Sequence, residues 1–235
     1  MNLKKRDCKI KMRLVPYGGG WTDVYIDFGD GEHYFIISSV DSSFGDLLSA
    51  LYHLYPENNN YEDAGNMIEY KSGICEWIND DYVVKRIVGN TKDETLGHVI
   101  QPIPWKASFE WDEEGSYSSW VLEREANINT SFDIKVTVDI HRKEPKQLEY
   151  VVPYADLCYA VADACTKALK KHGFLGYYTA TYTEDMNVRY LLFLKAAALG
   201  NMEALKLTYY EEQGQGETSD FGKEMELLLF DMSQG

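Results

Sequence analysis

The chain has 235 residues, of which 45% are hydrophobic and 14% aromatic, and its formal net charge is -15. This composition is typical of a globular protein and excludes a wholly disordered chain. An acidic body repels phosphate backbones, so we expect no general nucleic-acid binding. Residues 1–13 are nevertheless basic, with six lysines and arginines against Asp7. The acidity of the remainder is explained either by solubility or by attraction of a basic partner.

Cysteine usage and hydropathy indicate the compartment. The four cysteines, Cys8, Cys75, Cys158 and Cys165, have no CxxC spacing, and so few cysteines in a chain of this size are typical of a reducing compartment. The basic N-terminal run leads into alternating residues and not into the apolar stretch of a signal peptide. No apolar stretch approaches the roughly 18 residues of a membrane-spanning helix. We therefore expect a cytoplasmic protein that binds no membrane.

The N-terminal part predicts three strands and a helix. The strands are expected over residues 8–14, 24–28 and 34–38, because apolar and polar residues alternate there. Pro16 and the glycines at 18–20 are expected to end the first strand, and Asp30-Gly31 is a hairpin turn. A helix is expected over 43–55, where Ser43 and Asp46 have the spacing of a capping box and an apolar stripe follows.

Residues 57–107 show no long periodic pattern. Short strands are expected over 67–70, 73–77 and 82–87, and Pro102 and Pro104 are expected to break the chain. We interpret this segment as an insertion between two parts of one sheet or as a small subdomain.

A three-stranded meander is expected over residues 108–111, 119–125 and 132–141. The alternation is clearest from Phe132 to Ile140, where every second residue is apolar. This pattern predicts a strand with one buried face and one solvated face. Such a strand is typical of an antiparallel sheet that is covered on one side.

The C-terminal part predicts helices. The longest begins at Pro153 and ends at His172, because Gly173 can stop it in a left-handed conformation. Further helices are expected over 185–199, 202–209 and 223–231, with a polar loop at 213–219. We therefore predict a single α+β domain, in which helices 43–55 and 153–172 pack on one face of an antiparallel sheet. Residues 200–235 form a helical extension in this interpretation.

Known catalytic and metal-binding motifs are not found in the sequence. Gly18-Gly19-Gly20 lacks the Lys-Ser or Lys-Thr of a phosphate loop, and Asp27 and Asp30 lack calcium-loop spacing. The five histidines show no zinc-ligand spacing, and no GxSxG sequence is present. Accordingly, we assign no catalytic residue, no metal site and no cofactor. An enzyme whose site is assembled from distant residues stays an alternative, because spatial neighbours are invisible in one sequence.

The acidic run around residue 113 is the most distinctive local feature. It joins two predicted strands and carries three adjacent carboxylates between aromatic residues. A solvated turn is one interpretation. The other is a binding tip in which acidic groups steer a basic protein and aromatic rings anchor it. The candidate partner-binding residues are Trp111, Asp112, Glu113, Glu114 and Tyr117.

Four stretches carry a resemblance to known sequences: Gly20-Trp21 with the next strand, residues 38–54 with Phe44-Gly45-Asp46-Leu47-Leu48, residues 109–114 leading to Trp120, and Gly173–Tyr177 after the long helix. They resemble a family of functionally uncharacterised bacterial proteins, some of them similar to immunity proteins of polymorphic toxin systems. They cover about half the chain. The proline that often follows the acidic pair in the family is absent before Gly115, and residues 57–107 and those after Gly200 look like additions. The resemblance implies an α+β fold and leaves activity open.

These observations favour a non-catalytic, immunity-like binding protein that uses its acidic surface against a basic protein partner. An enzyme with a dispersed site and an adaptor in a larger assembly are the alternatives. The identity of the partner and the oligomeric state stay open at this stage.

Overall fold

The computed structural model describes residues 8–38, 44–55, 68–78, 81–87, 99–113, 115–124, 132–181, 186–205, 208–210 and 216–232. The strands are β1 (Lys11–Gly18), β2 (Trp21–Asp27), β3 (Glu32–Ser38), β4 (Ile68–Ile78), β5 (Asp81–Ile87), β6 (Val99–Asp112), β7 (Tyr117–Arg124), β8 (Asp133–His141), β9 (Lys146–Pro153), β10 (Thr208–Tyr210) and β11 (Gly216–Thr218). The helices are α1 (Phe44–Leu54), α2 (Tyr154–Ala180), α3 (Val188–Ala198), the short 3-10 helix η3 (Met202–Leu205) and α4 (Phe221–Leu229).

The predicted α+β class is confirmed, and the strands form two main antiparallel sheets. The larger has six strands in the order β5-β4-β6-β7-β8-β9, and the smaller has the order β1-β2-β3. A two-stranded ribbon pairs β10 with β11. The single sheet expected from the sequence is therefore divided, because β3 leads into α1 and does not pair with the six-stranded sheet.

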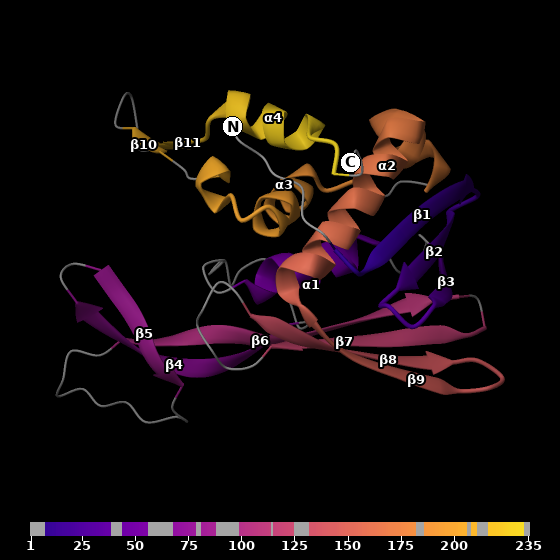
Figure 1. Ribbon diagram of the computed structural model, residues 1–235, viewed down its shortest axis with the longest axis horizontal. Helices are drawn as coiled ribbons and strands as arrows, with labels where there is room; N and C mark the ends of the chain where they lie inside the picture. The colour runs from indigo at the N-terminus through magenta and orange to yellow at the C-terminus, as the bar shows by residue number, and fades with distance from the viewer. Residues whose placement is uncertain are drawn as a thin grey trace.

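The helices and the smaller sheet all lie on one side of the six-stranded sheet (Figure 1). Helix α1 packs on β6, and α2 runs from the end of β9 along β1. Helix α3 packs against α1 and α2, and α4 packs on α3. In Figure 1 the smaller sheet lies above the end of the six-stranded sheet that carries the β8–β9 hairpin.

Aromatic side chains join the two sheets. The Phe35 ring of the smaller sheet lies 5.9 Å from Trp111 and 5.1 Å from Trp120 of the larger sheet. Phe109 stacks on Trp120 at 5.8 Å, and Phe44 of α1 stacks on Trp111 at 6.2 Å. All five are buried, and offset or edge-on aromatic contacts of this kind stabilise a core beyond the area they bury. This cluster is the centre of the hydrophobic core.

Strand β6 corrects one sequence prediction. Pro102 and Pro104 do not break the chain, because β6 runs through both of them. Among the described strands they pair with β4 alone, since the pairing of β6 with β7 begins at Lys106. A proline is tolerated in a strand where no partner needs its missing N–H. No described strand pairs with the other side of β6 along this stretch, a feature that the sequence pattern did not reveal.

In the C-terminal half, some of the predicted helices are confirmed and other predictions are wrong. Gly173 interrupts α2 with φ 68 and ψ 170, as predicted for a helix stop, and the chain then resumes a helical path to Ala180. Helices α3 and α4 confirm two of the later predictions. The helix expected over 202–209 is wrong, because only η3 forms and β10 follows it. Strand β9 was missed, and β11 occupies part of the predicted loop 213–219.

Other expectations fall partly outside the described residues. The capping role of Ser43 lies outside them, so only the body of α1 is confirmed. Cys158 is a free thiol that is fully buried. Among the described helices, none has the length and apolar character needed to cross a membrane.

Candidate functional site: the acidic face of the six-stranded sheet

The outer face of strands β6–β9 is made by alternate residues of each strand. Because successive side chains of a strand point to opposite sides, the buried residues mark the inner face and the residues between them the outer one. The outer side chains, which we call the acidic face, are Lys106, Ser108, Glu110, Asp112, Tyr117, Ser119, Val121, Glu123, Asp133, Lys135, Thr137, Asp139, His141, Gln147, Glu149 and Val151.

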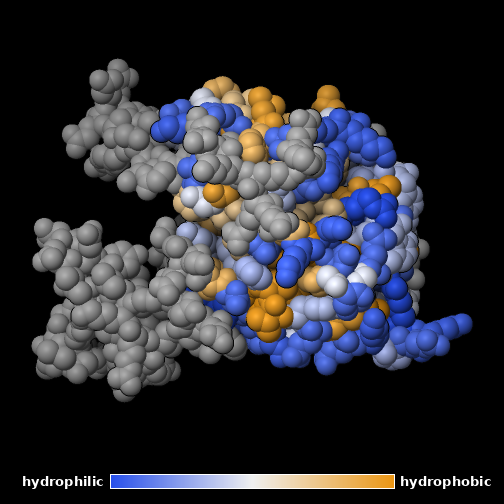
Figure 2. Space-filling view, in the orientation of Figure 1, coloured by the Kyte–Doolittle hydropathy of each residue, from blue (hydrophilic) through white to orange (hydrophobic). Residues whose placement is uncertain are grey.

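Carboxylates dominate the acidic face. Its six negative charges are balanced by only two positive charges, those of Lys106 and Lys135. The carboxylates belong to Glu110, Asp112, Glu123, Asp133, Asp139 and Glu149. In the part of the chain that the structure describes, no helix and no strand of the other sheets covers this side of β6–β9 (Figure 1). Figure 2 shows mostly hydrophilic side chains along the lower rim, over β8 and β9. The face therefore presents negative charge on a rigid, hydrogen-bonded support.

Cross-strand contacts orient the carboxylates. The Ser119 hydroxyl donates to Glu110 Oε1 at 3.0 Å, and the Gln147 amide donates to Asp139 Oδ1 at 2.7 Å. These two pairs share one row across the sheet, because Glu110 is registered with Ser119 and Ser119 with Asp139. Because the hydroxyl and the amide are uncharged, they hold the two carboxylates in position without neutralising their negative charge.

An ion pair and an aromatic pair also lie on the acidic face. Lys135 Nζ lies 3.0 Å from Glu149 Oε2, with both side chains about half exposed. Where β7 begins and β8 ends, the Tyr117 and His141 rings stack with centroids 4.1 Å apart. Tyr117 is 42% exposed, so its ring combines apolar area with a polar hydroxyl at the edge of the charged surface.

The predicted acidic loop divides between the core and the acidic face. Trp111 is fully buried in the aromatic core. The side chain of Glu113 is only 2% exposed, and its Oε2 accepts from Arg142 Nε at 2.7 Å and from the Ser116 hydroxyl at 3.1 Å. Arg142 also donates to the Tyr34 carbonyl oxygen at 3.0 Å. In this conformation Trp111 and Glu113 are structural residues that a partner cannot reach.

Asp112 and Tyr117 are the predicted residues that lie on the acidic face. They are registered opposite each other at the end of the β6–β7 hairpin. Glu114 lies outside the described residues. The other carboxylates of the acidic face were not among the predicted binding residues, although the alternation of β8 already assigned two of them to a solvated face; they are Glu110, Glu123, Asp133, Asp139 and Glu149. Whether these residues bind a partner stays a prediction.

A second polar cluster joins the β2–β3 turn to β9. The Tyr150 hydroxyl donates to Asp30 Oδ2 at 2.6 Å, and His33 Nε2 lies 2.8 Å from the same hydroxyl. The Tyr150 hydrogen bond, followed by that of His33, lowers the pKa of Asp30. Burial, followed by the bond to Asp30, raises the pKa of Tyr150. The Phe28 ring stacks on Tyr150 at 4.2 Å, so this cluster anchors the smaller sheet.

Metal-binding geometry is not found in the described part of the chain, where no group of three or more histidine, cysteine or acidic side chains converges. No family model, no curated protein and no solved structure matches this chain. The acidic face is therefore the feature from which a function is inferred.

Proposed function

We propose that the protein is a non-catalytic, immunity-like binding protein whose acidic face binds a basic protein partner. One observation carries the proposal: six carboxylates against two lysines lie on the open side of β6–β9. The immunity-like role follows the family resemblance of the sequence. We also expect the protein to act in the cytoplasm, where its thiols would stay reduced.

Electrostatic attraction would bring the partner to this surface. Exposed carboxylates raise the association rate through a field that salt screens over about 8–10 Å. The hydrogen bonds to Glu110 and Asp139 hold both carboxylates in position before the partner arrives. Little side-chain entropy is then lost on binding. Tyr117 supplies the aromatic area that commonly anchors such contacts.

A variant in which three carboxylates of the acidic face are neutralised tests the proposal. Glu110→Gln, Asp112→Asn and Asp139→Asn remove three negative charges and keep an acceptor oxygen at each position. The matched control, Glu144→Gln, Glu224→Gln and Glu226→Gln, removes the same charge from the β8–β9 turn and from α4. Each protein is used to capture partners from the native cell, and the captured proteins are identified by mass spectrometry.

We expect a basic protein to be captured by the wild type and the control, and to be lost or reduced with the face variant. Association rates with this protein are then measured at low and moderate salt. The face variant is expected to associate more slowly and with a flatter salt dependence. Equal rates for all three proteins at both salt concentrations would contradict the proposal.

A further inference from the structure

The outer side of the smaller sheet carries a cluster of aromatic side chains. Alternation along β1, β2 and β3 places the buried residues on the inner side and the residues between them on the outer side. Tyr17 is 56% exposed and Tyr34 38%, and the other outer rings are partly exposed. We define the aromatic face by six of the outer residues, which are Arg13, Tyr17, Trp21, Asp23, Tyr25 and Tyr34.

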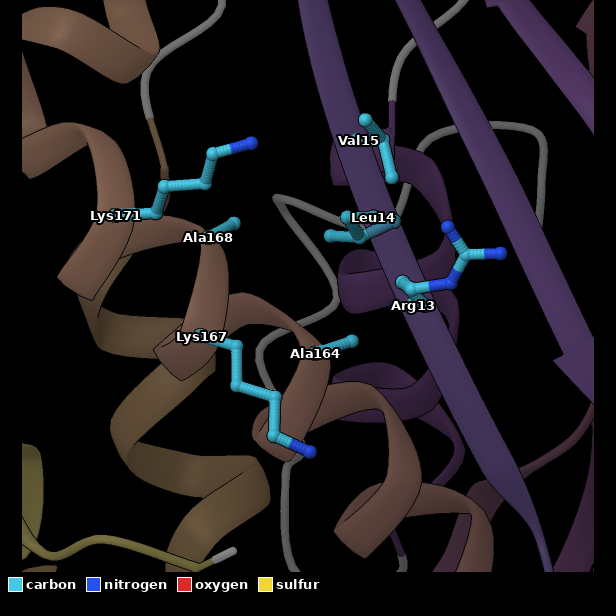
Figure 3. A pocket seen from close by; sticks show the side chains of 7 residues that line it. All are labelled: Arg13, Leu14, Val15, Ala164, Lys167, Ala168 and Lys171. Carbon is cyan, nitrogen blue, oxygen red and sulfur yellow. The ribbon is translucent and has the colours of Figure 1, made fainter.

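Helix α2 covers the edge of the smaller sheet and leaves the aromatic face open. Ala164 and Ala168 of α2 point towards β1, whereas the Arg13 guanidinium lies on the other side of the strand (Figure 3). The two main sheets meet through their inner sides, where the Phe35 ring contacts that of Trp111. The aromatic face and the acidic face therefore point in different directions.

Asp23 lies among these rings and has no charged partner. The Tyr34 hydroxyl donates to Asp23 Oδ1 at 2.8 Å, and the Tyr25 hydroxyl donates to Oδ2 at 3.5 Å. Burial, followed by the bond to Asp23, raises the pKa of Tyr34 to about 12, so its hydroxyl stays protonated at neutral pH. Within the described residues no cation pairs with Asp23. A carboxylate can accept about four hydrogen bonds, so Asp23 can still accept from a charged donor.

Two arginines of the protein already contact rings of the aromatic face. Arg13 Cζ lies 3.7 Å from the centroid of the Tyr25 ring, and Arg142 Cζ lies 5.9 Å from that of Tyr34. Arg13 also pairs with Glu32 at 3.5 Å, so its charge is balanced there. A planar guanidinium can stack on an aromatic ring and donate to a carboxylate at the same time. These contacts show that the chemistry of this face suits arginine.

Trp21 provides a further ring beside Asp23. The two residues are two positions apart on β2, so their side chains lie on the same side of the strand. The Trp21 side chain is partly exposed, and it makes no hydrogen bond, ring contact or cation contact within the described part of the chain. Tryptophan is the side chain whose ring attracts a cation most strongly. Trp21 and Asp23 together therefore suit a cationic side chain from another molecule.

We propose that the aromatic face binds an arginine side chain of a partner protein. The guanidinium would stack on Trp21 and donate to the remaining lone pairs of Asp23, and the exposed Tyr17 ring would add contact area. Tryptophan, tyrosine and arginine are the residues that most often dominate the binding energy of protein interfaces. This proposal does not rest on the acidic face, because the two surfaces point in different directions.

Blocked peptides test this proposal by nuclear magnetic resonance of the full-length protein. The probe has the sequence Gly-Ser-Arg-Ser-Gly and is added up to millimolar concentrations. The comparison peptide carries citrulline in place of arginine, which keeps the size and planarity of the side chain and removes its charge. The indole N–H signal of Trp21 is identified by its loss in Trp21→Phe. We expect the arginine peptide to shift this signal and the amide signal of Asp23, and the citrulline peptide to leave both in place.

Removal of one charge identifies the carboxylate that binds. Asp23→Asn is expected to weaken binding of the arginine peptide about fivefold, because an exposed ion pair is lost while an acceptor oxygen is kept. The matched control, Asp133→Asn, removes the same charge from the acidic face and is expected to leave the affinity measured at Trp21 unchanged. Thermal melts verify that both variants are folded. The comparison of the two peptides uses the wild type, so it decides the question even if Asp23→Asn does not fold.

Several outcomes would overturn the proposal. No shift of the Trp21 signal with the arginine peptide, or equal shifts with the citrulline peptide, would exclude a site for a guanidinium. Shifts of the same signals when the protein alone is concentrated would assign the aromatic face to a second copy of this chain. Shifts with cellotetraose and none with the arginine peptide would assign it to a neutral carbohydrate.

Discussion

Lys195 shows how one buried charge organises the C-terminal region. It lies on α3, has no exposed surface, and its Nζ donates to the carbonyl oxygens of Leu227 (3.3 Å), Leu228 (2.6 Å) and Phe230 (3.0 Å). Carbonyls at a helix end have no partner within the helix and carry partial negative charge. An ammonium with three donors satisfies them, so Lys195 fixes the end of α4 on α3.

Replacing Lys195 with methionine is expected to destabilise the protein by about 1–3 kcal/mol, because carbonyl acceptors at the end of α4 lose a charged donor. Burial, followed by repulsion from Lys170, lowers the pKa of Lys195 from 10.5 to about 8. Between pH 8 and pH 10.5, Lys195 is more fully protonated in the unfolded chain than in the folded protein. The free energy of unfolding therefore increases as pH rises through this range. The stability of the wild type relative to the variant is therefore expected to increase from pH 8 to pH 10 in urea titrations. A decrease over this range would contradict the assignment.

Glu113 is a structural residue, whereas the adjacent Asp112 lies on the acidic face. Glu113→Gln is expected to destabilise the protein by about 1–3 kcal/mol, because Arg142 loses the carboxylate partner it holds at 2.7 Å. Asp112→Asn on the acidic face is expected to change stability by no more than about 0.5 kcal/mol. Chemical unfolding of both variants measures the difference. If both variants lose equal stability, the buried carboxylate of Glu113 contributes no more to folding than the carboxylate of Asp112.

At the scale of elements, β8 shows how strand alternation separates core from binding surface. Its inner residues Ile134, Val136 and Val138 are fully buried beneath the helical layer. Its outer residues, Asp133, Lys135, Thr137 and Asp139, belong to the acidic face. A shift of one residue in register would exchange the two sets, so the packing of the core also fixes which charges a partner meets.

Val136→Asp is expected to destabilise the protein by about 4 kcal/mol or more, since it places an unpaired charge in the core. Thr137→Asp, one residue further along the same strand, is expected to have a mild effect because its side chain lies on the outer face. Thermal melts of the two variants provide the comparison. Similar losses of melting temperature would mean that the two faces of β8 are assigned incorrectly.

For the whole molecule, the packing of the smaller sheet on the larger one is the main feature of the architecture. The buried part of this contact is the aromatic cluster around Phe35, Trp111 and Trp120. At its solvent-exposed margin, Asp30 and His33 of the β2–β3 hairpin meet Tyr150 of β9. This polar cluster anchors the hairpin to the larger sheet in a way that depends on pH.

Tyr150→Phe is expected to lower stability at neutral pH, because the phenyl ring cannot donate to Asp30. The Tyr150 hydrogen bond contributes most to lowering the pKa of Asp30 below 3.8. The stabilisation is then fully present above pH 3.8 and is lost as pH falls through the lower folded-state pKa. The difference between wild type and variant is expected to shrink on acidification in denaturant titrations. A constant difference from pH 7 to pH 2.5 would show that the bond does not depend on the Asp30 charge.

The sequence by itself determined the elements whose signals are local. The alternation from Phe132 to Ile140 assigned both faces of β8, the Asp30-Gly31 turn joined β2 to β3, and Gly173 interrupted the long helix. Net charge also predicted acidity as the main surface property. These features depend on residues that are close in the chain, so their periodicity and turn chemistry are sufficient.

Only the tertiary structure decided which distant residues meet. It paired Glu113 with Arg142, which removed one predicted binding residue from the surface and left Asp112 and Tyr117 on it. It also let β6 continue through Pro102 and Pro104, because no described strand pairs with the side of β6 that would need their missing N–H groups. Finally, it packed α2 along β1, where the Cys8 thiol donates to the carbonyl oxygen of Asp156, 148 residues further along the chain. Such contacts arise from packing between elements, and no local pattern in the sequence records them.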